Sequence, residues 1–134
     1  MIDDCLFCKI VKGEVPSYTL YEDKDVKVFL DIFPVSKGHS LFVPKNHFEE
    51  IFDIPEEKMV FLKKLPILAS KLKEVTNATG LNVIQSNGKD AGQVIRHVHF
   101  HLIPRFPDDG VIKLPEQAEI DETVAKDLLD KFQI

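Results

Sequence analysis

The pattern of hydrophobic and polar residues divides the chain into five strands and two helical stretches. Five runs rich in β-branched and aromatic residues, each bounded by turn residues or proline, predict the strands. They cover residues 17–21, 26–30, 40–43, 81–85 and 94–103, and the last is expected to be the longest.

Between the third and fourth strands the apolar residues recur at steps of three and four, which predicts an amphipathic helix. Pro55 suits its first position, and Gly80 lies just beyond its end. Pro66 falls inside it and would cost about 3 kcal/mol in a helix interior, so either the helix bends there or its limits differ. The recurring residues are Met59, Leu62, Leu65, Leu68, Ala69, Leu72 and Val75.

Strands joined by turns, with helices set apart from them, favour an antiparallel α+β fold. A final helix is expected over 123–132, and the 134 residues fit a single domain, 1–134. The net charge of −5 argues against non-specific nucleic-acid binding, and the apolar runs are too short to cross a bilayer. Because the chain starts without a secretory signal, we expect a cytoplasmic protein.

The candidate chemistry concentrates in the histidines. His97, His99 and His101 alternate along the last expected strand, so they would share one side while the apolar residues between them face the core. A polar sheet face in water explains two such histidines more readily than three. On a strand the outer two stand roughly 13 Å apart, too far to bind one metal ion. The three histidines are therefore expected to have different roles.

Cys5 and Cys8 are the two cysteines of the chain. A disulfide would close almost no loop and needs an oxidising compartment, which leaves a metal half-site, a redox pair or two inert thiols. A redox pair is the weakest of these, because only four residues precede Cys5. With His47 and His97 the cysteines would form a closed tetrahedral zinc site of the structural type. Two buried thiols beside a core histidine are the alternative.

His99 is the candidate nucleophile. An imidazole with one nitrogen held by a hydrogen bond offers the lone pair of the other to an electrophile such as phosphorus. His101 and His39 could donate to a phosphoryl oxygen or move protons. Serine and cysteine nucleophiles are less attractive, because the serines lie in no nucleophile motif and the cysteines are better used on a metal.

The loop over residues 85–93 leads directly into the histidine strand. Gly88 and Gly92 permit tight turns and close approach of the backbone to an oxyanion, while Asn87 and Gln93 add side-chain donors. The loop matches neither a P-loop nor a dinucleotide fingerprint, and alone it would be ordinary turn chemistry. Its position before the histidines favours phosphate binding.

Together these motifs resemble the histidine triad family of nucleotide hydrolases and transferases, in its zinc-bearing branch. The most specific part is Gly92-Gln93 followed by the three alternating histidines. The resemblance extends over nearly the whole chain, in segments 5–10, 31–32, 38–39, 43–47, 87–88, 91–93 and 97–105.

The resemblance implies an α+β fold with an antiparallel sheet, one long helix and short helices at both ends. It implies a homodimer whose sheets join across the interface. His99 would attack the α-phosphorus of a nucleotide, and water would then release a nucleoside monophosphate from the nucleotidyl-histidine intermediate. His101 would contact the phosphate, and His39 would support the proton network. The zinc ligands of this branch match the two cysteines, His47 and His97.

The resemblance also implies substrate contacts. Asp31 lies where the family binds the ribose hydroxyls, and Asn87 and Gln93 match polar residues beside the phosphate. The positions around the nucleobase, for which simple core packing is the alternative, are Phe7, Phe29 and Ile32.

Two positions bear on the reaction. Val94 stands where the purine phosphoramidase branch commonly has a small hydroxyl residue, which leaves one phosphate hydrogen bond and the preferred leaving group open. His101 stands where the uridylyltransferase branch has glutamine, which favours hydrolysis.

The predicted substrate is a purine nucleoside phosphoramidate, a dinucleoside polyphosphate or a related adenylylated compound. The alternatives are a nucleotide-binding or sensing protein and a hydrolase in which zinc activates water.

Overall fold

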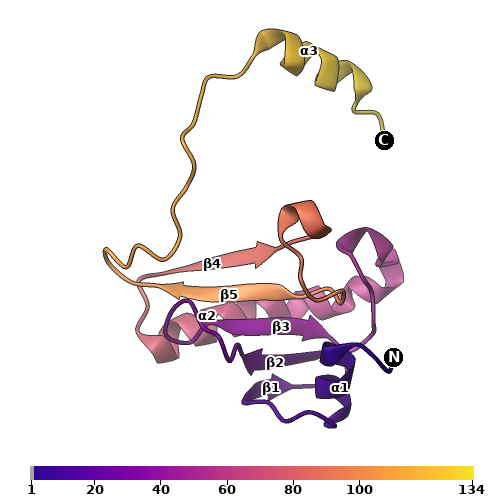
Figure 1. The fold of residues 1–134 in the computed structure, drawn as a ribbon, viewed down its shortest axis with the longest axis vertical. Helices are drawn as coiled ribbons and strands as arrows, with labels where there is room; N and C mark the ends of the chain where they lie inside the picture. The colour runs from indigo at the N-terminus through magenta and orange to yellow at the C-terminus, as the bar shows by residue number, and fades with distance from the viewer. Residues whose placement is uncertain (1) are drawn as a thin grey trace.

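A computed structural model describes residues 2–134 and contains a five-stranded antiparallel sheet in the order β1-β2-β3-β5-β4 (Figure 1). The α+β prediction is therefore confirmed. The strands are β1 (Thr19–Glu22), β2 (Val26–Leu30), β3 (Ser40–Pro44), β4 (Gly80–Gln85) and β5 (Phe100–Arg105). The helices are α1 (Leu6–Lys12), α2 (Leu65–Thr76) and α3 (Glu122–Lys131), and the 3-10 segments are η1 (Ile51–Asp53), η2 (Glu56–Lys64) and η3 (Lys89–Ala91).

Different helices cover the two faces of the sheet. The far face in Figure 1 packs on η2 and α2, where Phe61 and Leu72 belong to the same core cluster as Phe42. On the opposite face α1 packs against β2, and Phe7 meets Phe29 edge-on with ring centroids 5.7 Å apart. Because apolar groups cover both faces, the central strands β2 and β3 are almost completely buried.

Strand alternation decides which way the histidines point. Phe100 and Leu102 belong to the core cluster under α2, so His101 between them lies on the face that carries α1. In register, His101 pairs with Leu41 of β3 and with Ile84 of β4. The predicted separation of histidines from apolar residues is confirmed at this strand.

The last strand is shorter than its sequence predicts. It begins at Phe100 and not at residue 94, so at six residues it equals β4 in length. Pairing with β3 and with β4 stops at Phe100, and the backbone before it finds other partners. The N–H of Val98, for example, donates to the carbonyl of Phe48 at 2.7 Å. His97 and His99 therefore lie on irregular backbone just before the strand.

The long helical stretch is divided, and its predicted limits are wrong. Nine residues of 3-10 helix precede α2, and Pro66 falls in the first turn of α2, where no hydrogen-bonded N–H is required. Pro66 therefore does not kink α2. The helix ends at Thr76 and is capped by Asn77, which takes the left-handed conformation with φ 57°, whereas Gly80 begins β4.

The chain begins and ends with short helices, as expected. α1 starts at the N-cap residue Cys5, and α3 starts at the N-cap residue Asp121. In Figure 1, α3 stands away from the sheet at the end of an extended segment, and no residue of α3 is buried. Among residues 2–134, none of the helices combines the length and the apolar character that crossing a bilayer requires.

Candidate functional site

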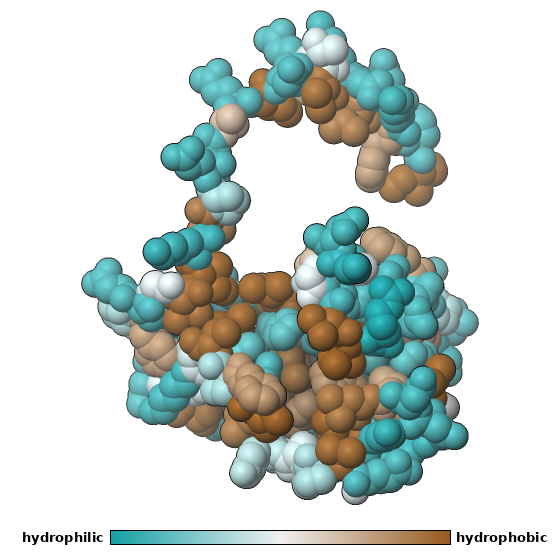
Figure 2. Space-filling model, in the orientation of Figure 1, coloured by the Kyte–Doolittle hydropathy of each residue, from teal (hydrophilic) through white to brown (hydrophobic). Residues whose placement is uncertain are grey.

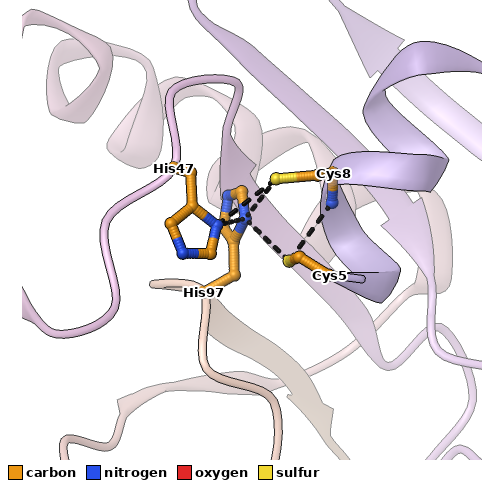
Figure 3. Close-up of side chains that lie close together, drawn as sticks. All are labelled: Cys5, Cys8, His47 and His97. Carbon is orange, nitrogen blue, oxygen red and sulfur yellow. Dashed lines mark hydrogen bonds between the residues drawn. The ribbon is translucent and has the colours of Figure 1, made fainter. Parts of the chain in front are cut away.

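Cys5, Cys8, His47 and His97 come together where α1 meets the segment before β5 (Figure 3). Their ligand atoms all lie within 4.8 Å of one another. Cys5 is the N-cap of α1, and its Sγ accepts from the N–H of Cys8 at 3.4 Å. The spacing of the cysteines thus brings both sulfurs to one end of the helix, while the histidines arrive from the segments after β3 and before β5.

The distances within this cluster fit a tetrahedral zinc ion. Nδ1 of His97 lies 3.4 Å from Sγ of Cys5, 3.6 Å from Sγ of Cys8 and 3.2 Å from Nδ1 of His47. A tetrahedron with bonds of about 2.3 Å to sulfur and about 2.0 to 2.1 Å to nitrogen has edges of about 3.3 to 3.8 Å. His97 Nε2–H donates to the carbonyl of Pro44 at 2.8 Å, which aims the Nδ1 lone pair into the cluster. Burial lowers the pKa of His97 to about 4, so the ring is neutral and able to ligate at neutral pH.

His99 lies beside this cluster and is 8% exposed. Its Nδ1–H donates to the carbonyl of His97 at 2.6 Å, and because a carbonyl can only accept, the lone pair of the ring is on Nε2. Phe7 packs edge-on against the ring, with centroids 4.9 Å apart and an interplanar angle of 86°. Burial lowers the pKa of His99 and keeps this lone pair unprotonated at neutral pH.

A second hydrogen-bond chain determines the proton positions on His101. The N–H of Val35 donates to Nδ1 of His39 at 3.1 Å, so His39 carries its proton on Nε2. That Nε2 lies 2.9 Å from Nδ1 of His101 and 3.6 Å from a carboxylate oxygen of Asp31. His101 accepts on Nδ1 and therefore carries its own proton on Nε2.

His101 is thus a neutral donor next to the free lone pair of His99. The two rings have centroids 5.1 Å apart. Burial lowers the pKa of His39, and burial together with the neighbouring His99 and His39 lowers the pKa of His101 to about 4. The ligand atoms of Asp31, His39 and His101 also lie within 4.8 Å of one another, a spacing that could hold a metal ion. However, Nε2 of His39 and Nδ1 of His101 already share a hydrogen bond.

The amide of Gln93 holds the preceding loop together. Its Oε1 accepts from the N–H of Gly88 at 2.8 Å, and its Nε2 donates to the carbonyls of Glu49 at 2.6 Å and Ile95 at 3.2 Å. The residue is 6% exposed. Gly92 beside it is exposed and takes φ 89°, a conformation that glycine adopts without strain. Gln93, which was expected beside the phosphate, thus forms hydrogen bonds with the backbone of the loop and of the segments around it.

Asn87 is tied to the same framework. Its Oδ1 accepts from the N–H of Ile51 at 2.7 Å and from Nε2 of Gln85 at 2.8 Å, and its Nδ2 donates to Oε1 of Gln85 at 2.6 Å. The amide nitrogen has two hydrogens, and among the described residues only one of them has a partner. The other hydrogen of Asn87 therefore remains for a ligand.

The residues expected around a nucleobase differ in their exposure. Phe7 and Phe29 are 4% and 3% exposed and pack in the cluster under α1, whereas Ile32 is 68% exposed. Asp31 accepts from the N–H of Phe33 at 2.9 Å through the oxygen that does not face His39. Of the three residues expected around the nucleobase, Ile32 is the one with an exposed apolar side chain. Phe7 contacts the rings of His97 and His99.

Several groups that orient the histidines could not be identified from the sequence. The carbonyls of Pro44 and His97 and the N–H of Val35 set the tautomers of the three neighbouring rings. These are peptide groups, which nearly every residue carries, so no residue type marks them in the sequence.

The arrangement agrees with a comparison with known proteins, in which a model of the HIT domain matches residues 12–108. The chain belongs to the HIT domain family. This HIT protein is 44% identical over 119 residues to an uncharacterized HIT-like protein of Methanocaldococcus jannaschii, covering 87% of this chain and 92% of that one. It is 46% identical to the adenosine 5′-monophosphoramidase of Saccharomyces cerevisiae over 75% of this chain and 62% of the other, and 40% identical to an adenylylsulfatase of Arabidopsis thaliana over 80% and 55%.

Solved structures share the fold of this HIT protein. A protein of Streptococcus mutans is similar with a TM-score of 0.91 and 39% identity over 99% of this chain and 88% of the other. A histidine triad nucleotide-binding protein of Candida albicans is similar with a TM-score of 0.81 and 38% identity over 96% and 94%. The predicted HIT-like fold is therefore confirmed.

Proposed function

We propose that this protein hydrolyses purine nucleotides at the α-phosphate through a nucleotidyl intermediate on His99. The observation that carries the proposal is the tautomer of His99, whose Nδ1–H is held by the carbonyl of His97 while Nε2 keeps its lone pair. Two relatives are named as an adenosine 5′-monophosphoramidase and an adenylylsulfatase. The substrate class is accordingly a nucleoside phosphoramidate, a dinucleoside polyphosphate or a related adenylylated compound.

The proposed chemistry has two displacement steps at phosphorus. The Nε2 lone pair of His99 forms the new nitrogen–phosphorus bond as the bond to the leaving group breaks, and the leaving group takes up a proton from solvent water. Water then attacks phosphorus and releases one proton to solvent as the nitrogen–phosphorus bond breaks, which gives the nucleoside monophosphate and restores the neutral imidazole. The Nε2–H of His101 donates to the phosphoryl oxygen as charge develops on it, and His39 holds the ring of His101 in that tautomer.

The substrate contacts follow from exposure and from unused hydrogen-bonding groups. Asp31 would accept from the ribose hydroxyls, and the exposed Ile32 would contact the nucleobase. Gly92 lets the backbone approach the phosphate, and Asn87 contributes its remaining amide donor. Phe7 and Phe29 would form the buried floor of the base site, whereas Gln93 would act on the phosphate through the loop it supports.

We also propose that Cys5, Cys8, His47 and His97 hold a structural zinc ion. The cluster supplies four protein ligands, which leaves no open position for a water or a substrate. This favours a structural ion over the alternative in which zinc activates water. Zinc bound there would fix the carbonyl of His97 that orients His99.

The working enzyme would be a cytoplasmic homodimer. In the strand order, β4 lies at the edge of the sheet, so its outer backbone groups can pair with the same strand of a second copy. Such pairing would join the two sheets as the resemblance implies.

The test is to trap the intermediate on the full-length protein. Adenosine phosphoramidate is mixed with enzyme and the reaction is quenched in alkali, because nitrogen–phosphorus bonds of this type are labile in acid. We expect an adenylyl group on the peptide that contains His99. His99→Ala should lower kcat by roughly 10³-fold or more, whereas Lys89→Ala, at an exposed position, should change it little.

A variant His99→Ala or His99→Asn that keeps most of the activity would remove the nucleophile assignment. Tight binding of adenosine monophosphate with negligible turnover on all three substrate classes would instead support a nucleotide-binding protein.

A further inference from the structure

One carboxylate lies against the linked histidines of the site. Oδ2 of Asp31 is 3.6 Å from Nε2 of His39, and among residues 2–134 no other carboxylate pairs with a histidine. The side chain of Asp31 is 20% exposed and that of His39 is 5% exposed, so the contact is largely shielded from water. The proposed chemistry uses this carboxylate for the ribose hydroxyls and leaves its position beside the imidazoles unexplained.

The backbone holds Asp31 in this position. Its N–H donates to the carbonyl of His39 at 3.0 Å, and its Oδ1 accepts from the N–H of Phe33 at 2.9 Å. The N–H of Val35 in the same turn donates to Nδ1 of His39 at 3.1 Å. The carboxylate and the imidazole therefore belong to one hydrogen-bonded turn, which keeps Oδ2 beside Nε2 of His39.

The charge of Asp31 acts on more than one ring. The ring centroids of His39 and His101 are 5.1 Å apart, and those of His101 and His99 are also 5.1 Å apart. Burial lowers the pKa of both His39 and His101, and the negative charge of Asp31 opposes that shift in each. The carboxylate thus favours positive charge along a row of imidazoles that ends at His99.

The first step of the proposed reaction creates a positive charge at the end of this row. His99 keeps its proton on Nδ1, so the ring becomes a cation when Nε2 bonds to phosphorus. His99 is 8% exposed, and Phe7 packs against its ring. Figure 2 shows that apolar side chains also gather over the middle of the face that carries α1. A charge in such surroundings is costly unless an opposite charge compensates it.

We propose that Asp31 has a second role, in which its carboxylate stabilises the positive charge that forms on His99 during nucleotidyl transfer. The inference rests on the proposed function, which supplies the intermediate. The carboxylate forms and breaks no bond in this role, and it acts across the rings of His39 and His101. Because the charge exists in the intermediate and not before or after it, the carboxylate speeds the formation of the intermediate and slows its hydrolysis.

This role can be separated from ribose binding. A contact with the ribose hydroxyls stabilises the bound substrate and the transition state alike, so it acts on KM and not on the rate of the bonding step. It also disappears when the substrate has no hydroxyls. Stabilisation of the charge on His99 remains with such a substrate, because it depends on the carboxylate of Asp31 alone.

The test follows both steps in the full-length protein, with enough enzyme to bind all of the substrate. The substrate is an analogue of adenosine phosphoramidate in which hydrogen replaces both ribose hydroxyls. Alkaline quenching at successive times measures the appearance and the loss of the nucleotidyl group on His99. Asp31→Asn removes the charge and keeps an oxygen for the N–H of Phe33. Asp90→Asn, the matched control, removes an equal charge at an exposed position of the loop before the histidines.

We expect Asp31→Asn to slow the appearance of the nucleotidyl group by at least about fivefold and not to slow its loss. Asp90→Asn should stay within about twofold of the unaltered protein in both steps, because water screens an exposed charge. Asp31→Glu restores the charge and should return the rate of appearance to within about threefold of the unaltered protein. A variant whose fold is disturbed would instead slow both steps.

Other outcomes contradict the proposal in different ways. Equal rates of appearance for Asp31→Asn and the unaltered protein would leave ribose binding as its only role. Equal slowing of both steps, an equal effect of Asp90→Asn, or no recovery in Asp31→Glu would show that the local charge is not the cause. Absence of a nucleotidyl group on His99 of the unaltered protein, with adenosine phosphoramidate itself, would contradict the proposed function and this inference with it.

Discussion

Three residues of one type differ in which ring nitrogen can act because their hydrogen-bond partners differ. His97 gives its side chain to the cysteine cluster and its carbonyl to His99. His99 is left with a free Nε2, whereas His101 accepts on Nδ1 and is left with a donor. The chemistry of each imidazole is therefore decided by which of its two nitrogens is already engaged.

The pH dependence of kcat/KM reports the state of His99. Burial lowers the pKa of His99 below the ordinary value of 6.5, so the ring is neutral at pH 7 and its lone pair is free. Protonation at lower pH occupies the lone pair. We therefore expect kcat/KM to be level near neutral pH and to fall only below pH 6.5.

Circular dichroism at each pH controls for unfolding in this profile. That control is needed because His101, with its pKa lowered to about 4, resists protonation in the folded state more than in the unfolded state. Its contribution to stability is present above pH 6.5 and is lost as the pH falls toward 4. A decline in kcat/KM that begins above pH 6.5 in fully folded protein would contradict the assignment.

At the scale of elements, the site depends on irregular segments held by side chains. The loop between β4 and β5 has no strand partner, so amides replace the ladder hydrogen bonds. Gln93 bridges the N–H of Gly88 to the carbonyls of Glu49 and Ile95. The loop is thereby fixed just before His97 in the chain without strand pairing.

Replacing Gln93 should destabilise the protein. Gln93→Leu leaves the part-buried N–H of Gly88 and the carbonyl of Glu49 without their partner, and each such group costs about 1 kcal/mol. The carbonyl of Ile95 still accepts from the N–H of His97. We expect the free energy of unfolding in urea to fall by about 2 kcal/mol, with a lower kcat as the loop shifts. Lys89→Ala, at an exposed position of the same loop, should change it by less than about 0.5 kcal/mol. Equal effects of the two substitutions would show that the amide does not brace the loop.

At the scale of the whole molecule, the cysteine and histidine cluster joins three segments far apart in sequence. Cys5 and Cys8 belong to the start of α1, His47 follows β3, and His97 precedes β5. A metal ion there would tie the N-terminal helix to the backbone that orients His99. Its binding energy would then contribute directly to folding stability.

We expect one zinc ion per chain and a lower melting temperature when it is removed. Chelation should lower Tm by about 5 °C or more and expose both thiols to alkylation. Cys8→Ser should lose the zinc and also the response to chelator, which separates metal removal from other effects of the reagent. Untagged protein without zinc, whose thiols react freely in the folded state, would contradict the proposed site.

Local patterns predicted the bounds of several elements closely. The run over 26–30 coincides with β2, and the helix expected over 123–132 lies within one residue of α3. The failures have a common cause. Residues 94–99 alternate like a strand, but strand status also needs a neighbour to pair with, and both neighbours of β5 stop pairing at Phe100. Whether Pro66 breaks a helix similarly depends on where the 3-10 segment ends and α2 begins.

The sequence by itself determined the fold class, the alternation that puts His101 on one face and Phe100 on the other, and the residue types able to ligate a metal. These follow from local periodicity and side-chain chemistry, which act over a few residues. Only the tertiary structure decided the tautomers, the meeting of Cys5 with His97, and the use of Gln93 as a brace. Those depend on peptide groups and side chains that are distant in sequence and become neighbours when the sheet and helices pack.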